Sequence, residues 1–339
     1  MSEEVIRYVG VGIEESFATE ATSSMHVDIA DASLDTPDEQ EMVFEGGLTR
    51  GNLVKRPGSY VPEGDITYAM DVNSIGYLLY LALGYGEEVD ADTNTHKYNF
   101  NADPIDRLLP TGTFYVAKDK FIHKFVGGAV DELSIAVDSE FAEVTASVVA
   151  KKDSDGGPPE SDITNLELPD AYPLAFHEVS VEVGDKGDTL ESKVVESVDL
   201  TISNNIDTEQ GISLGSRYMQ KVIAGDLGVS ADLEIAFSSK EQLEDFWGSA
   251  SGPGADGSQE KQISITFDSG THGKLVIDIP RAYYESVSLE PSGTDRLIQT
   301  VSLTSLYDET AESEIIASLD NDYEYDTNYD WLVDSTSTT

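Results

Sequence analysis

The chain has 339 residues, and its 65 aspartates and glutamates outnumber 20 lysines and arginines, which gives a formal net charge of −45. Such a composition offers no basic patch for phosphate groups and argues against affinity for nucleic acid. The absence of cysteine excludes disulfides, thiolate metal sites and cysteine nucleophiles. The amino terminus lacks the pattern of a signal peptide, and no stretch approaches 18 consecutive apolar residues, so we expect a soluble protein made in the cytoplasm.

Acidic residues are spread along the whole chain, and residues 301–339 still carry 10 acids and no base. Their mutual repulsion opposes a compact fold in dilute buffer, whereas at molar salt the Debye length falls to about 3 Å. A disordered acidic chain would be poor in aromatic residues, but this chain contains 16 Tyr and 11 Phe. We therefore expect a folded protein adapted to a salt-rich cytoplasm.

The first 60 residues have the pattern of an arm with short strands, at Val5–Val11 and Met25–Ile29. A helix is predicted over Ile75–Leu83, which is apolar on nearly every side and is followed by Gly84, a residue that commonly ends helices. A helix with this composition requires burial on all sides.

Period-two alternation then predicts two long hairpins. The first joins Val130–Asp138 to Glu143–Ala150, and the second joins Tyr283–Glu290 to Arg296–Tyr307. In both hairpins one face is apolar, and the opposite face carries short polar or acidic side chains. Five further alternating segments are predicted to be strands: Val179–Val183, Val194–Ser203, Gly228–Phe237, Ile263–Phe267 and Lys274–Ile279.

A second, amphipathic helix is predicted over Glu241–Trp247, before Gly248. With roughly ten strands and two helices, the pattern indicates an all-β protein with appended helices, built as a β-sandwich or barrel. We expect one domain over residues 1–310, with a solvated insertion at about 151–173. An acidic, Tyr-rich extension follows at 311–339.

Isolated motifs for catalysis or metal binding are weak. Gly211–Gly215 matches the G-x-S-x-G pattern around Ser213, with His272 downstream, but a nucleophile elbow requires an apolar strand before it and a helix after it. The histidines are scattered singly, without metal-ligand spacing. Asp320–Asp326 resembles the start of a calcium loop, yet it lacks the glycine and the closing glutamate that such a loop needs. We expect no cofactor and no metal.

Taken together and in their order, several segments resemble the tail tube proteins of tailed viruses, in the version built by viruses of haloarchaea. The matching segments are Tyr8–Thr19, Gly46–Gly51, Gly64–Ile66, Ile75–Gly84, Thr95–Tyr98, Leu109–Pro110, Phe114–Val116, Val195–Asn205, Glu241–Trp247 and Ser292–Val301. The resemblance implies a virion protein without enzymatic activity. It also implies hexameric rings that stack into the tube through which viral DNA enters the host cell, with tape measure, tail completion or baseplate proteins as partners.

Within that architecture, we expect the polar faces of the two hairpins to line the lumen, because a channel for DNA should offer short side chains and no cations. The candidate lumen residues are Glu132, Ser134, Asp138, Thr145, Ser286, Ser288, Thr300 and Ser302. The apolar helix is expected to be buried partly against a neighbouring subunit. The candidate interface residues are Ile75, Leu78, Leu79 and Leu81.

Two other functions compete with this interpretation. A monomeric β-sandwich of a halophile could bind carbohydrate or protein, in which case aromatic residues should cluster on one exposed face. A hydrolase using Ser213 is the third alternative.

Overall fold

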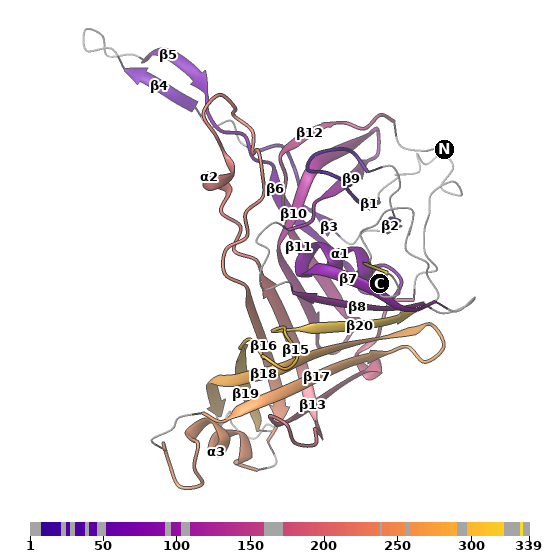
Figure 1. The fold of residues 1–339 in the computed structure, drawn as a ribbon, viewed down its shortest axis with the longest axis vertical. Coiled ribbons are helices and arrows are strands. Elements are labelled where there is room, and N and C mark those ends of the chain that lie inside the picture. The colour runs from indigo at the N-terminus through magenta and orange to yellow at the C-terminus, as the bar shows by residue number, and fades with distance from the viewer. Residues whose placement is uncertain are drawn as a thin grey trace.

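The computed structural model describes residues 8–21, 25–27, 31–37, 41–45, 52–91, 96–102, 109–158, 172–237, 239–254, 258–289, 297–321 and 333–334. Most of these residues lie in strands, and nearly all strand pairs are antiparallel and belong to one large, bent sheet (Figure 1). The described helices are few and short. This confirms the all-β fold with appended helices.

Strand β10 (Phe121–Val137) organises one half of the molecule. Its first half pairs with β9 (Gly112–Lys118) and β12 (Lys152–Asp155). Its second half pairs with β11 (Glu143–Val149) and β15 (Val195–Ser203). The first predicted hairpin is therefore confirmed, but its leading strand begins well before the predicted Val130.

Two glycines allow β10 to pass from one set of partners to the other. Gly127 has a φ of +65°, a conformation that side chains disfavour. A Cβ on Gly128 would lie 2.5 Å from the Phe114 ring, so only glycine fits there. The pairing with β9 shifts its register at this point, where the strand bends.

Strand β18 (Gly273–Leu289) makes a similar transition. Its first half lies between β17 (Glu260–Asp268) and β20 (Ile316–Asn321), and its second half pairs with β19 (Ile298–Ser305). Pro280, which has no amide hydrogen to donate, lies where the partner changes. Two separate strands were predicted here, and the structure joins them because the proline falls at an interruption of the ladder.

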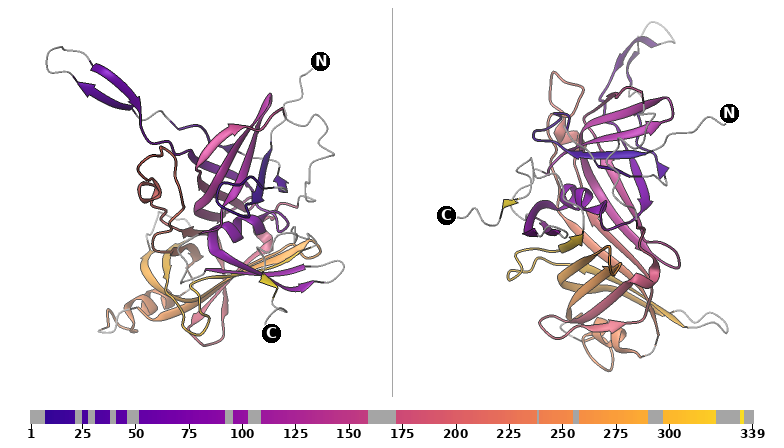
Figure 2. Two further views of the ribbon diagram at one scale, coloured as in Figure 1. Left: turned by 45° about the horizontal axis from the view of Figure 1, so that its top comes forward. Right: turned by 90° about the vertical axis from the view of Figure 1, so that its right-hand side faces the viewer.

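The remaining elements complete the sheet and its attachments. The other strands are β1 (Val9–Ile13), β2 (Met25–Val27), β3 (Asp31–Ala32), β4 (Glu41–Glu45), β5 (Asn52–Pro57), β6 (Glu63–Ala69), β7 (Gly84–Ala91), β8 (His96–Ala102), β13 (Val179–Asp185), β14 (Glu191–Lys193), β16 (Gly228–Ala236) and β21 (Val333–Asp334). The helices are α1 (Ile75–Leu83), α2 (Thr208–Gly211), α3 (Glu241–Trp247) and the 3-10 turn η2 (Phe176–Glu178). Two views from other sides show β4 and β5 projecting away from the body (Figure 2).

Helix α1 confirms the predicted range, and Gly84 closes it in the left-handed conformation with a φ of +89°. The helix lies inside the curve of the sheet and packs against β1, β7, β8 and β10 (Figure 1). Buried Asn204 holds its last turn in place, because the side-chain amide donates to the backbone oxygens of Ala82 and Val130 at 2.9 and 3.0 Å.

Segments of the predicted arm, insertion and extension pair with strands of the main sheet. Strand β1 is buried between β2 and β9. Beyond residue 310, β20 pairs with β8 and β18 and buries Leu319 in the core. In the predicted insertion, β12 pairs with β10, whereas residues 159–171 lie outside the described residues.

Glu14 ties the segment after β1 to the sheet. Its buried carboxylate accepts hydrogen bonds from the backbone amides of Ala18 and Gly127, each at 2.8 Å. It also accepts from the hydroxyls of Thr111 and Thr113, at 2.8 and 2.9 Å. All four donors would lose their acceptor if the carboxylate were removed.

We expect Glu14→Gln to lower the free energy of unfolding by about 2 to 4 kcal/mol, because the amide cannot accept from all four donors, three of which are buried. Chemical denaturation measures the change. The exposed neighbour Glu15 provides the matched control, and Glu15→Gln should change the free energy of unfolding by less than about 0.5 kcal/mol. Equal stability of the two variants would show that the Glu14 contacts contribute nothing.

Candidate functional site

The outward sides of the two predicted hairpins belong to one continuous sheet surface. The hairpins are separated by β15 and β16, so the strand order is β6, β11, β10, β15, β16, β19 and β18. Alternate residues of these strands enter the core, and the others point outward. We call these outward residues the polar face, taking β10 from Glu132 onward and β18 from Tyr283 onward.

The strand register aligns the outward residues in rows that cross the polar face. One row contains Thr67, Thr145, Ser134, Thr201, Ser230 and Thr304. The adjacent row contains Ala69, Glu143, Ala136, Asp199, Asp232, Ser302 and Ser286. Both rows run across the strands of the polar face and consist of small, hydroxyl-bearing or acidic side chains.

The chemical character of the polar face is hydroxylic and acidic. The hydroxyls of Thr67 and Thr145 lie 2.9 Å apart, and Ser147 donates to the Asp65 carboxylate at 2.6 Å. Among the described residues of the polar face, none is lysine, arginine or histidine. Arg281 lies two residues before Tyr283 on β18, beyond the limit of the face, and its guanidinium is paired with Glu260 at 2.5 Å. A polyanion that approached the polar face would therefore meet no free cation on it.

Two acidic residues directly face each other in the middle of the polar face. Asp199 on β15 is opposite Asp232 on β16, and both are exposed. Like charges in this position destabilise a sheet. High ionic strength screens this repulsion, so we expect salt to stabilise the sheet at this pair.

The structure brings together most of the predicted lumen residues. Of the eight, Asp138 lies in the turn after β10, and the other seven belong to the polar face. Arg296, with which the returning strand of the second predicted hairpin begins, lies outside the described residues. Sequence reasoning did not include β15 and β16, although their alternation of apolar with polar or acidic residues gave the same signal as the hairpins.

The ends of the polar face differ from its middle, because they lack full strand partners. Among the described residues, the stretch of β18 from Tyr284 to Leu289 pairs only with β19. At the opposite end, the part of the chain that the structure describes pairs with the outer side of β6 only through the two-residue strand β3 and an isolated bridge between Asp35 and Glu63. Open strand edges of this kind can pair with another chain.

A family model described as phage tail tube protein matches residues 6–312. The chain belongs to the phage tail tube protein family. The match spans every strand of the polar face. No curated protein matches the chain significantly.

Members of this family are structural proteins of the virion tail and are not enzymes, and they assemble with other tail proteins. The family therefore accounts for the absence of a convincing catalytic motif in this tail tube protein. In the described part of the chain, no helix is long and apolar enough to cross a membrane.

The four candidate interface residues lie in α1 and are already buried within one chain. Ile75, Leu79 and Leu81 are 0 % exposed, and Leu78 is 2 % exposed. The curved sheet of the same chain encloses the helix, so the burial of these side chains does not require a neighbouring subunit. In this conformation the four side chains offer no surface to a second copy.

Among the described strands of the tail tube protein, β4 and β5 pair only with each other. The β4–β5 hairpin forms a separate two-stranded sheet and leaves Met42 and Val54 exposed. An isolated two-stranded hairpin is only marginally stable in water. Its apolar side chains are therefore available for contact with another molecule.

Both ends of the projecting hairpin are attached to the body through Asp153 on β12. The hydroxyls of Thr36 and Tyr60 donate to its carboxylate at 2.7 and 2.5 Å. His123, which is buried, contacts the same carboxylate through Nε2 at 2.8 Å. Burial and the adjacent Asp153 raise the pKa of Tyr60 to about 12, so its hydroxyl remains a donor at physiological pH. The carboxylate thus ties Thr36, before the hairpin, and Tyr60, after it, to β12.

The structure does not assemble the elements of a serine hydrolase around Ser213. This serine lies exposed in a turn after α2, whereas a nucleophile elbow lies between a strand and a following helix. His272 stacks on Tyr172 with ring centroids 4.2 Å apart, in a different part of the chain. Among the described residues, no group of three or more histidines or carboxylates is arranged to hold a metal ion.

Proposed function

We propose that six copies of this chain form a ring, that the rings stack into the tail tube, and that the polar face lines its channel. The observation that carries the proposal is the continuity of the polar face across seven strands without a cation. Each lysine or arginine that contacts DNA neutralises a phosphate and adds affinity. A wall of hydroxyls and carboxylates instead lets viral DNA pass into the host cell without specific binding.

The open edges support the formation of a ring. If the free side of β18 pairs with the β3–β6 end of the next subunit, the polar faces of the ring become one closed surface. Closure removes exposed strand edges, which otherwise promote aggregation. The polar face then lines the lumen through Glu132, Ser134, Thr145, Ser286, Ser288, Thr300 and Ser302, with Asp138 at its rim.

The acidic composition supports assembly in a salt-rich host, as for a virus of haloarchaea. The tube ends would contact tape measure, tail completion or baseplate proteins. A binding module for carbohydrate or protein is less well supported, because the polar face carries only one aromatic residue among its described members, Tyr283.

Negative-stain microscopy of the purified protein in molar KCl tests assembly directly. Hollow rings or tubes are expected, and uniformly monomeric particles would contradict the proposal.

The projecting β4–β5 hairpin supports ring stacking, because a marginal hairpin with exposed apolar residues gains stability when another subunit covers it. We expect that replacing residues 41–57 with a short Gly-Ser linker leaves the body folded, since these strands pair only with each other. Rings should still form, whereas tubes should be lost. Electron microscopy and thermal unfolding measure the two effects.

The matched control for this deletion is Met42→Ser with Val54→Ser, which keeps the hairpin and removes its exposed apolar groups. Shorter tubes are expected from this variant. Tubes of normal length from both variants would exclude the hairpin as a stacking element.

A further inference from the structure

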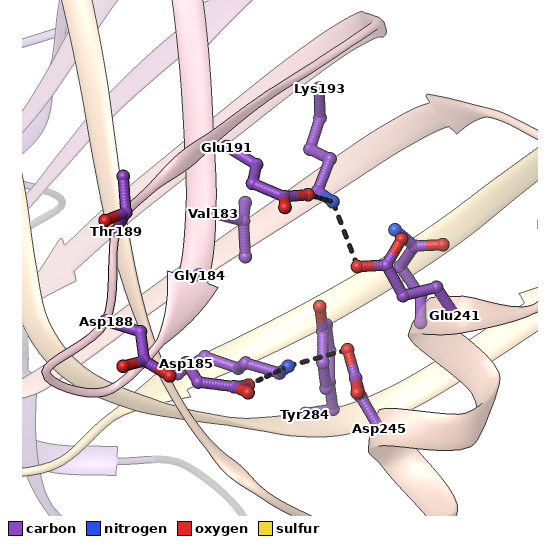
Figure 3. Close-up of a pocket in the computed structure, with 12 residues that line it drawn as sticks. Val183, Gly184, Asp185, Asp188, Thr189, Glu191, Lys193, Glu241, Asp245 and Tyr284 are labelled. Atoms are coloured by element: carbon purple, nitrogen blue, oxygen red, sulfur yellow. Dashed lines mark hydrogen bonds and ion pairs between the residues drawn. The ribbon is translucent and has the colours of Figure 1, made fainter. Parts of the chain in front are cut away.

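A second feature of the molecule lies away from the polar face, in a pocket of about 170 Å³ between the β13–β14 hairpin and α3 (Figure 3). Lys261 on β17 and Tyr284 on β18 form part of its wall. The pocket is on the inward side of β18, because Tyr284 is buried whereas its neighbour Glu285 is exposed. None of its lining residues belongs to the proposed channel wall.

Two lysines in the pocket are each held by two carboxylates. The ammonium group of Lys261, whose side chain is 6 % exposed, lies 2.5 Å from Asp185 and 2.6 Å from Asp245. Lys193 lies 3.2 Å from both Glu191 and Glu241. Neither ammonium group is therefore available to neutralise a further negative charge.

The lining carries more negative than positive charge. Five carboxylates, including Asp188 at the rim, face two ammonium groups. Burial raises the pKa of Asp245, and Lys261 opposes this effect, while the charges of Asp185 and Glu241 raise the pKa further. An additional cation in the pocket would be attracted, and an anion would be repelled.

Two largely buried side chains line this pocket and make no side-chain hydrogen bond to the described residues. Tyr284 is 4 % exposed and projects between the two lysine clusters, and no hydrogen bond joins its hydroxyl to the residues around it (Figure 3). Gln242 is 6 % exposed, and its side-chain amide likewise lacks a hydrogen bond to the described chain. Their polar atoms open onto the pocket, so a ligand bound there can form hydrogen bonds with them.

We propose that this pocket binds the ammonium group of a small alkylammonium ion. Its three donors match the acceptors present, namely the Tyr284 hydroxyl oxygen, the Gln242 amide oxygen and the free carboxylate oxygens. Burial raises the pKa of Tyr284 well above its usual range, so the phenol stays neutral and does not compete as an anion. At about 30 Å³ for each water-sized group, the pocket of about 170 Å³ has room for roughly five or six heavy atoms, the size of a four-carbon amine.

The test uses 1,4-diaminobutane and the full chain in 1 M KCl, where diffuse attraction to surface carboxylates is screened. Isothermal titration should give saturable binding with one site per subunit. Tyr284→Phe and Gln242→Leu should each weaken binding at least about fivefold, as expected for one lost hydrogen bond. Ser288→Ala on the polar face is the matched control and should leave the affinity unchanged, and uncharged 1,4-butanediol should not bind.

Equal affinity of the original chain and both pocket variants would overturn the proposal, because binding would then be non-specific attraction to the acidic surface. No saturable binding would overturn it as well. If MgCl₂ binds in place of the diamine and depends on Tyr284 and Gln242, the pocket is an inorganic cation site and the assignment of an ammonium ligand is wrong. Circular dichroism of each variant verifies that the fold is retained.

Discussion

Leu79→Asp should prevent the isolated chain from folding. Leu79 is 0 % exposed at the centre of α1, and no described base lies on this helix to pair with a new carboxylate. Burial of an unpaired charge costs several kcal/mol. The total free energy of unfolding of a domain is only about 5 to 15 kcal/mol. Near-ultraviolet circular dichroism and the loss of a cooperative unfolding transition measure the effect.

Ser288→Asp is the matched control, because it introduces the same group on the exposed polar face and should leave the fold intact. Leu79→Met keeps the apolar volume and should lower the free energy of unfolding by less than about 1.5 kcal/mol. A Leu79→Asp chain that folds normally but fails to assemble would contradict our account. That result would instead place α1 at a subunit boundary.

Reduction of the KCl concentration from about 2 M to 0.1 M should unfold the protein cooperatively. The Debye length rises over this range from roughly 2 Å to about 10 Å, so repulsion among the excess carboxylates acts over longer distances. The net charge of −45 has no compensating basic region. Fluorescence of the two tryptophans and far-ultraviolet circular dichroism follow the transition.

Single substitutions can separate repulsion from a general salt effect. Asp199→Asn removes one member of the opposed acidic pair and should move the midpoint to lower salt. Glu260→Gln removes a carboxylate that lies 2.5 Å from Arg281, so it should not move the midpoint in that direction. Cooperative folding of the unmodified chain retained at 0.1 M KCl would show that the acidic surface does not require salt.

The helices and most strands were predictable because local patterns determine them. The apolar run of α1 and its closing glycine fixed the helix at Ile75–Leu83, as observed. Alternation predicted the hairpins for the same reason. The long strands β10 and β18 were not predicted in full, because Gly127, Gly128 and Pro280 look like breaks in a sequence. In three dimensions they mark the points where one strand changes partners.

The candidate site was only partly accessible to sequence reasoning. Periodicity identified the outward residues of each hairpin but could not reveal that β15 and β16 join them into one surface, because strand order depends on contacts distant in sequence. The helix shows a different limit of the sequence. A segment such as α1 that is apolar all round needs cover, but the sequence does not say whether the cover is the same chain or another one.

A reconstruction of the assembled tube at side-chain resolution tests the central claim most directly. Our account predicts that Glu132, Ser134, Ser288 and Ser302 point into the channel and that β15 and β16 lie between the two hairpins on the inner wall. A tube in which these four residues face the outer surface, while other strands line the channel, would contradict it.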